Sequence, residues 1–294
     1  MTTTTRVDLE SQLTLDTLGP SFGAEVIGLD LNTATDQQIA AISQAVVTHK
    51  VLFFRGQDLT DDDQVTFGRR LGNLTAGHPV APSVDFEHPE IYSIDSADPD
   101  FSFSDVWHTD VTFMESPPLG SILRAVQLPP SGGDTSWVDS QLAYESLSAP
   151  VQRLVDQLDA VHDGNREWGN YLKHGRGGRG NEWDGQLVTE LPPVAHPVVR
   201  VHPATGRKGL FVNPGFTSHI EGVSEAESRG ILDLLYAHLT KPEHTIRHRW
   251  QAGDVGIWDN RSTSHYANRD YTATRVMRRI TLAGDRPVGP SRAA

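Results

Sequence analysis

The chain has 294 residues, of which 37% are hydrophobic, so it can bury a sizeable core in one β-rich domain or in two small ones. Its formal net charge of −13 argues against nucleic acid and anionic membranes as partners, and an anionic ligand would need a local cationic pocket. Because the chain contains no cysteine, disulfides, thiolate metal sites and cysteine nucleophiles are excluded, and a metal must be bound by histidine, aspartate or glutamate.

We expect one cytoplasmic domain over residues 1–294, with an N-terminal extension over about residues 1–20. The sequence has neither a run of about 18 apolar residues nor the apolar core of a signal peptide. Residues 174–181 are rich in glycine and arginine. They lie in a segment, about residues 164–186, that we predict to be either a lid over an active site or a flexible loop. The acidity of the chain disfavours RNA contact through this one basic segment.

Three amphipathic helices are predicted from their start signals. Thr35, Thr60 and Ser224 each stand three residues before Gln, Asp or Glu, a capping-box pattern, and apolar residues at helical spacing follow. Gly72 is expected to end the second helix and Pro242 the third. Short stretches rich in β-branched and aromatic residues predict strands at residues 51–54, 121–126, 198–201, 210–212, 255–258 and 275–282. Strands and helices do not alternate regularly, so a doubly wound parallel sheet is not expected.

The tripeptide His108-Thr109-Asp110 places an imidazole and a carboxylate two residues apart. In an extended segment both side chains point to the same side, whereas a helix would separate them by about 200°. A second histidine, His265, follows far downstream. Two nitrogens and one oxygen on one face of an octahedron leave three positions open, which is the facial triad of non-haem Fe(II) oxygenases.

An ordinary surface pair is the alternative interpretation of the tripeptide, because the chain has 13 histidines. The sequence His88-Pro89-Glu90 has the same spacing, yet its proline and acidic surroundings indicate an exposed turn. His265 follows a predicted strand that ends at Trp258, so it can reach back into a barrel. Asp259 and Asn260 are predicted to set the intervening turn through side-chain hydrogen bonds to nearby backbone.

The strand predicted over residues 275–282 carries three arginines. Period-2 alternation puts Arg275, Met277 and Arg279 on one face and Arg278 on the other. If the first face is buried, two guanidinium groups about 13 Å apart point inward, which suggests two anionic ligands. Arg278 would then be exposed or salt-bridged. The alternative is an edge strand on which all three are surface charges.

These candidates lie within sequence blocks that follow one another in a specific order: residues 107–113, 132–135, 196–200, 210–213, 215–216 and 258–268. Together the blocks resemble the taurine dioxygenase branch of the Fe(II)/2-oxoglutarate-dependent dioxygenases, the TauD/TfdA family, from Gly23 to Pro287. The resemblance implies an α+β, mainly β fold with a distorted double-stranded β-helix (jelly-roll) core and flanking helices. Relatives commonly associate, so a homo-oligomer, dimer or tetramer, is expected.

The resemblance also implies roles for individual residues. His108, Asp110 and His265 correspond to the iron ligands. Thr135 and Arg275 correspond to the residues that hold the co-substrate 2-oxoglutarate, where a planar two-pronged guanidinium suits a carboxylate. Residues implied to bind the prime substrate are Arg279 and His78 for its sulfonate, and Val111, Phe113, Trp168 and Phe216 for the pocket wall.

The implied reaction consumes 2-oxoglutarate and O2 and hydroxylates the carbon next to the sulfonate of taurine or a related alkanesulfonate, which releases sulfite and an aldehyde together with succinate and CO2. Ala81 and Ser104 replace a tyrosine and an asparagine of the taurine enzymes, and Trp168 replaces a phenylalanine, so the amine end of the pocket departs from their pattern. An alkyl sulfate ester dioxygenase (alkylsulfatase) of the same family is the nearest alternative. A zinc hydrolase would need a His-Glu-x-x-His helix, which is absent from the sequence, and a non-catalytic jelly-roll binding module would not need the triad.

Overall fold

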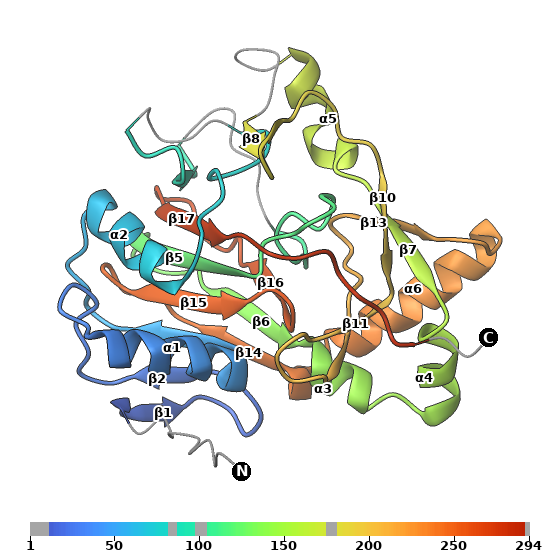
Figure 1. Ribbon diagram of the computed structural model, residues 1–294, viewed down its shortest axis with the longest axis horizontal. Helices are drawn as coiled ribbons and strands as arrows, with labels where there is room; N and C mark the ends of the chain where they lie inside the picture. The colour runs from blue at the N-terminus through green and yellow to red at the C-terminus, as the bar shows by residue number, and fades with distance from the viewer. Residues whose placement is uncertain (1–11, 82–86, 98–104, 175–180, 292–294) are drawn as a thin grey trace, which may run out of the picture.

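Two sheets packed face to face form the core of the molecule (Figure 1). The computed structural model describes residues 12–81, 87–97, 105–174 and 181–291. The larger sheet has the strand order β1 (Leu15–Thr17), β2 (Ala24–Val26), β3 (Val51–Phe54), β15 (Val255–Asp259), β5 (Gly120–Gln127), β17 (Val276–Leu282) and β4 (Tyr92–Asp95). All neighbours in it are antiparallel except β2 and β3.

The facing sheet is smaller, with the order β14 (Thr245–His248), β6 (Thr135–Asp139) and β16 (Thr263–Ala267). Trp137 of β6 lies edge-on to Phe53 of β3 and to Trp258 of β15, with ring centroids 5.3 and 5.7 Å apart. These aromatic contacts join the inner faces of the two sheets. The arrangement is the predicted jelly-roll core with flanking helices.

Three further sheets lie beyond this core. One has the order β10 (Val194–Pro197), β7 (Asp159–His162) and β13 (Thr217–Ile220), and the two others are the pairs β11 (Val199–Val201) with β12 (Lys208–Leu210) and β8 (Glu182–Trp183) with β9 (Gln186–Leu187).

Helices α1 (Asp36–His49) and α2 (Asp61–Leu71) cover the outer face of the larger sheet. Ile42 of α1 and Val65 of α2 pack with Leu52, Ile122 and Ile280, which alternate along their strands with inward-facing residues. Helices α3 (Ser140–Glu145), α4 (Ala149–Val155), α5 (Asn165–His174) and α6 (Glu225–Leu239) and the 3₁₀ helix η2 (Pro242–His244) complete the fold. Among the described residues, no helix has the length and apolar character needed to cross a membrane.

The predicted helix starts are confirmed, because α1, α2 and α6 begin with reciprocal capping boxes at Thr35, Thr60 and Ser224. The strand predicted at 210–212 lies two residues earlier, at Lys208–Leu210, where it pairs with β11. Beyond its end, the backbone N–H of Phe211 still donates to the carbonyl oxygen of Val198 at 2.7 Å. Residues 164–186 contain α5 and the β8–β9 hairpin, whereas residues 175–180 of the glycine-rich segment lie outside the described part of the chain. The lid or loop remains a prediction.

Candidate metal centre and its two pockets

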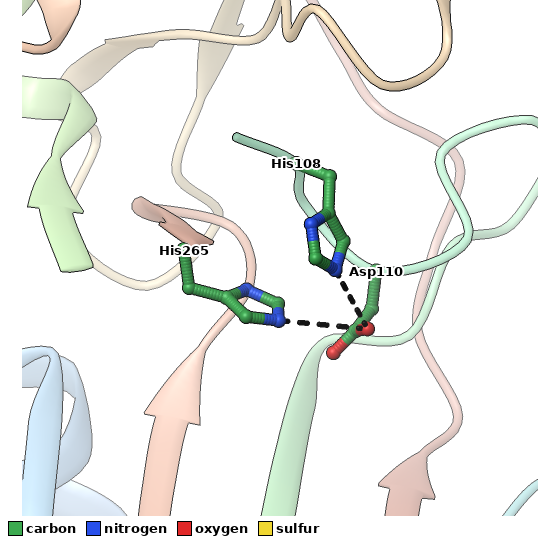
Figure 2. A group of neighbouring side chains, drawn as sticks. All are labelled: His108, Asp110 and His265. Atoms are coloured by element: carbon green, nitrogen blue, oxygen red, sulfur yellow. Dashed lines mark ion pairs between the residues drawn. The ribbon is translucent and has the colours of Figure 1, made fainter. Parts of the chain in front are cut away.

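The three predicted metal ligands lie together. His108 pairs its backbone with His265 of β16 in an isolated antiparallel bridge, which brings two distant parts of the chain side by side. The Oδ1 atom of Asp110 lies 4.0 Å from Nε2 of His108 and 3.9 Å from Nε2 of His265. Figure 2 shows both imidazoles pointing toward this carboxylate. One ligand atom from each residue falls within 4.8 Å of the others, so the cluster can close on one metal ion.

The protonation of the cluster suits a metal ligand set. Nδ1 of His108 lies 2.8 Å from the carbonyl oxygen of Val106, which places its proton there and leaves Nε2 as a lone-pair donor. Burial lowers the pKa of His265 to about 3, so that this imidazole is neutral. Burial alone would raise the pKa of Asp110, but the Arg279 guanidinium and the two imidazoles hold it below its ordinary value. The site therefore presents the Nε2 atoms of two imidazoles and one carboxylate oxygen as ligand atoms.

The chain reverses directly after the second ligand. The expected extended conformation holds at His108, but a turn begins at Asp110, and Val111 adopts φ 56°, a left-handed conformation that a β-branched residue rarely takes. The hydroxyl of Thr112 shares a hydrogen bond with Nδ1 of His162 at 2.9 Å and accepts one from Nδ2 of Asn213 at 3.1 Å. These buried contacts hold the turn that aims Asp110 at the two imidazoles.

A first pocket adjoins the cluster on the side of Arg275. Its lining includes Thr135, Arg275, His108 and His265. Nε of Arg275 donates to the carbonyl oxygen of Gly133 at 3.0 Å, and the residue is 4% exposed. Gly133 has φ 75°, and a Cβ on it would lie 3.1 Å from Cδ of Arg275, so glycine permits the close approach. This buried cation can take an anion beside the metal ligands.

A second pocket adjoins the cluster and includes Asp110 in its lining. Of the residues predicted to bind the prime substrate, those that line it are His78, Val111, Trp168, Phe216 and Arg279. Phe113 does not line this pocket. It lies behind Phe216, with ring centroids 4.9 Å apart, and supports the wall. The lining also includes Tyr92, Val106 and Glu167, which the sequence analysis did not single out.

His78 is set up as a neutral hydrogen-bond donor in the second pocket. Its Nδ1 accepts the backbone N–H groups of Val80 at 3.1 Å and Ala81 at 2.9 Å, so the ring proton resides on Nε2. Burial and the charge of Arg279 lower the pKa of His78 well below its ordinary value. Ala81 is buried, and its backbone fixes the orientation of His78. Ser104, the other departure from the taurine pattern, lies outside the described residues.

The alternation predicted for β17 is confirmed. Arg275, Met277 and Arg279 are buried, whereas Arg278 binds Ser93 and lies 3.6 Å from Asp61. Arg279 lines both pockets, and its Nη1 lies 2.5 Å from Oδ1 of Asp110. Nε of Arg279 is buried and has no hydrogen-bond partner among the described residues. The two arginines thus supply positive charge to two adjacent pockets.

The sequence analysis missed the hydrogen bonds behind Asp110. Ser121 of β5 donates to Oδ2 of Asp110 at 2.6 Å, and Nδ2 of Asn260 donates to the Ser121 hydroxyl at 2.9 Å. The prediction for Asn260 was wrong, because its side chain binds two other side chains instead of nearby backbone: its Oδ1 accepts the indole N–H of Trp258 at 2.8 Å. The only sequence signal was the position of Ser121 within a predicted strand.

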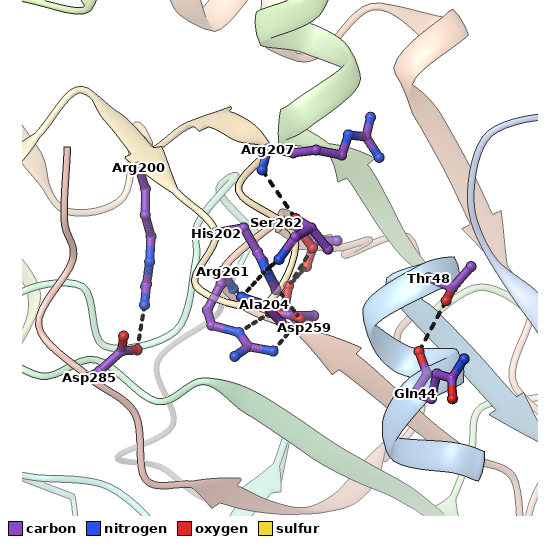
Figure 3. Close-up of polar contacts among 12 residues, drawn as sticks. Gln44, Thr48, Arg200, His202, Ala204, Arg207, Asp259, Arg261, Ser262 and Asp285 are labelled. Atoms are coloured by element: carbon purple, nitrogen blue, oxygen red, sulfur yellow. Dashed lines mark hydrogen bonds and ion pairs between the residues drawn. The ribbon is translucent and has the colours of Figure 1, made fainter. Parts of the chain in front are cut away.

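Asp259 anchors the turn before His265 from within a buried charge cluster (Figure 3). Its carboxylate accepts from Nε2 of His202 at 3.0 Å and from Nε and Nη2 of Arg261 at 2.8 and 2.7 Å. It also accepts the backbone N–H of Arg261 at 2.9 Å, as the sequence predicted. The backbone of Asp259 accepts the hydroxyl of Thr263 at 2.8 Å. These contacts fix the chain that leads from β15 to the ligand on β16.

A buried cluster of two histidines and one carboxylate beside a jelly-roll core, flanked by two cationic pockets, defines a metal-dependent oxygenase. The family model described as "Taurine catabolism dioxygenase TauD, TfdA family" matches residues 14–281. The chain therefore belongs to the TauD/TfdA family, and it is an alpha-ketoglutarate-dependent dioxygenase.

Three similar proteins illustrate the relationship. The chain is 42% identical to an alpha-ketoglutarate-dependent sulfate ester dioxygenase of Pseudomonas putida over 91% of this chain and 88% of that protein. It is 39% identical to an alkylsulfatase of Acinetobacter baylyi over 95% of this chain and 87% of that protein. The crystal structure of a taurine dioxygenase from Burkholderia xenovorans matches with a TM-score of 0.78 and 41% identity, covering 95% of this chain and 91% of that one.

Proposed function

We propose that this enzyme binds Fe(II) at His108, Asp110 and His265 and uses 2-oxoglutarate and O2 to hydroxylate the carbon next to the sulfonate of taurine or a related alkanesulfonate. The observation that carries the proposal is the placement of the ligand cluster between two pockets, each with a buried arginine. The hydroxylated product would break down to an aldehyde and sulfite, while 2-oxoglutarate gives succinate and CO2.

The donor set fits Fe(II). Two neutral imidazoles and one carboxylate are the ligands of the non-haem iron oxygenases, and their arrangement leaves room for other ligands. Bound there, Fe(II) would supply the activation of O2 that this oxidation requires. The alternative of zinc would support hydrolysis and not the consumption of 2-oxoglutarate.

The first pocket is suited to 2-oxoglutarate. Arg275 would hold the distal carboxylate, because its guanidinium is buried and offers two parallel donors. The hydroxyl of Thr135 accepts the indole N–H of Trp250 at 2.9 Å, which leaves its own proton for the co-substrate. Both side chains lie on the lining that also includes His108 and His265.

The second pocket is suited to a small anion with an apolar chain. Arg279 would supply charge, and the neutral His78 a hydrogen bond, to the sulfonate oxygens. Val111, Trp168 and Phe216 would hold the carbon next to it and exclude water. The protein thereby keeps one C–H bond beside the metal.

A sulfate ester would use the same residues, and the names of two relatives favour testing it. Its hydroxylation would release sulfate, whereas a sulfonate releases sulfite. We therefore propose a panel of taurine, longer alkanesulfonates and alkyl sulfates, assayed for succinate, sulfite and sulfate with protein loaded with Fe(II) or Zn(II). We expect the protein loaded with Fe(II) to release sulfite from the sulfonates, and the protein loaded with Zn(II) to release none. Turnover of alkyl sulfates only would replace the sulfonate proposal, and succinate release that no substrate stimulates would overturn both.

We also propose a homo-oligomer, dimer or tetramer, in the cytoplasm. Light scattering of the purified full chain tests the assembly, and fractionation of the source cells tests the compartment.

A further inference from the structure

We propose that Trp258, Asn260 and Ser121 form a hydrogen-bond relay that commits one oxygen of Asp110 to the protein and reserves the other for the metal. The inference rests on the proposed function, because it concerns how the carboxylate serves the metal site. All three relay side chains are buried, and they come from neighbouring strands: Trp258 of β15 is the ladder partner of Ser121 of β5. Asn260 is held beside them by its backbone N–H, which donates to Leu119 at 3.0 Å.

The indole fixes the direction of every bond in the relay. Nε1 of Trp258 can only donate, so the atom of Asn260 that faces it must be the oxygen. The amide nitrogen of Asn260 then faces Ser121 and donates to its hydroxyl. Because the serine oxygen accepts this bond, its single proton is available for Oδ2 of Asp110, 2.6 Å away. The relay therefore has one polarity and ends on one defined oxygen.

The other oxygen of Asp110 faces the two imidazoles. Oδ1 is the atom that lies within 4.0 Å of both Nε2 atoms, and it also accepts from Arg279. A carboxylate that bound the metal through both oxygens would occupy one of the three positions that a facial triad leaves open. Two-pronged binding of 2-oxoglutarate together with O2 needs all three. By holding Oδ2, Ser121 acts as a positioning residue that keeps the third position available.

The test compares Ser121→Ala with Ser264→Ala in the full chain. Ser264 is a matched control, because it is also buried beside the cluster but bonds Thr109 instead of Asp110. Ser121→Cys is the second variant, since it keeps the size of the side chain and offers a weak donor. The readouts are Fe(II) affinity and the electron paramagnetic resonance signal of nitric oxide, an O2 substitute, bound to Fe(II) with and without saturating 2-oxoglutarate.

We expect Ser121→Ala to weaken Fe(II) binding by about 10- to 100-fold. At saturating Fe(II) it should bind nitric oxide alone but lose most of the signal when 2-oxoglutarate is added, whereas Ser264→Ala should match the wild type. The Fe(II) affinity and the nitric oxide signal of Ser121→Cys should lie between those of Ser121→Ala and the wild type. If the alanine variant does not fold, the cysteine variant provides the test. Wild-type signals in either Ser121 variant would overturn the inference. Failure of the proposed metal site would already appear as absent Fe(II) binding in the wild type.

Discussion

Arg279 contacts the metal ligand Asp110 and lines the second pocket with the same guanidinium, whereas Arg275 lies four residues earlier in the first pocket. Of the two, Arg279 lines both pockets and contacts the ligand cluster, whereas Arg275 lines the first pocket without contacting a ligand residue. Lysine would keep the charge at either position but would lose the planar pair of donors that matches a carboxylate or sulfonate. Lysine substitutions at the two positions can therefore distinguish the role of the first pocket from the role of the second.

We predict a crossed pattern for the two lysine variants. Arg275→Lys should raise KM for 2-oxoglutarate, and Arg279→Lys should lower kcat/KM for the sulfonate, each by about 10- to 100-fold. Steady-state succinate release measures both. Arg278→Lys is the control, because Arg278 lies between them but faces Ser93 and Asp61. Equal losses for both substrates in both variants would contradict the two-pocket assignment.

Glu167 gives the second pocket a negative charge in addition to Asp110. A carboxylate at this position stabilises a substrate that carries an ammonium group away from its sulfonate, and a purely apolar chain lacks that interaction. We predict that Glu167→Gln lowers the preference for taurine over 1-propanesulfonate, a sulfonate of similar size that lacks the ammonium group, by about fivefold. The ratio of the two kcat/KM values is the measurement. Glu190→Gln, an exposed carboxylate outside the pocket lining, should leave the ratio unchanged, and an unchanged ratio in Glu167→Gln would exclude this role.

At the scale of elements, the turn before β6 places the backbone of Gly133 against Arg275 of the first pocket. Gly133 and Gly28 have nearly the same left-handed φ, 75° and 73°, but a Cβ would meet Arg275 at the first and nothing within 4 Å at the second. We predict that Gly133→Ala raises KM for 2-oxoglutarate by about tenfold, because Arg275 must move. Both substitutions should lower the stability of the fold by a similar amount through backbone strain, but Gly28→Ala should leave KM for 2-oxoglutarate unchanged. Thermal unfolding and initial rates distinguish the two effects, and a raised KM in both variants would contradict the argument.

The elements that the sequence predicted correctly are those whose signals are local. Capping boxes specify helix starts within four residues, and the alternation in β17 showed which arginines face inward. The short helices α3 and α4 carry too few turns to show a period, and the apolar run at residues 210–212 placed the strand β12 two residues too late. The metal ligands were found through the order of motifs, whereas the link from Ser121 to Asn260 depends on strand pairing across 139 positions, which one sequence does not contain.

At the scale of the molecule, ion pairs with at least one buried partner join segments that are distant in the chain. Lys50, directly after α1, binds Asp139 at the end of β6 at 2.7 Å, and Arg200 of β11 binds Asp285 at 2.7 Å. Asp259 forms its own ion pairs with Arg261 and His202 (Figure 3) and precedes the strand that carries His265. Stability in acid and the geometry of the metal site therefore depend on shared ion pairs.

Acid should weaken the fold through Asp259. Burial alone would raise the pKa of this carboxyl, but Arg261 and His202 lower it from 3.8 to about 2. A lowered folded-state pKa stabilises the protein above the unfolded value, so the contribution is complete above about pH 4 and is lost as the pH falls through about 2. The shift corresponds to about 2 kcal/mol. We predict that the difference in unfolding free energy between the wild type and Asp259→Asn, measured in urea, shrinks between pH 5 and pH 2.5. Asp16→Asn on exposed β1 should show no such trend, and a difference for Asp259→Asn that stays constant with pH would contradict the ionic role of this residue.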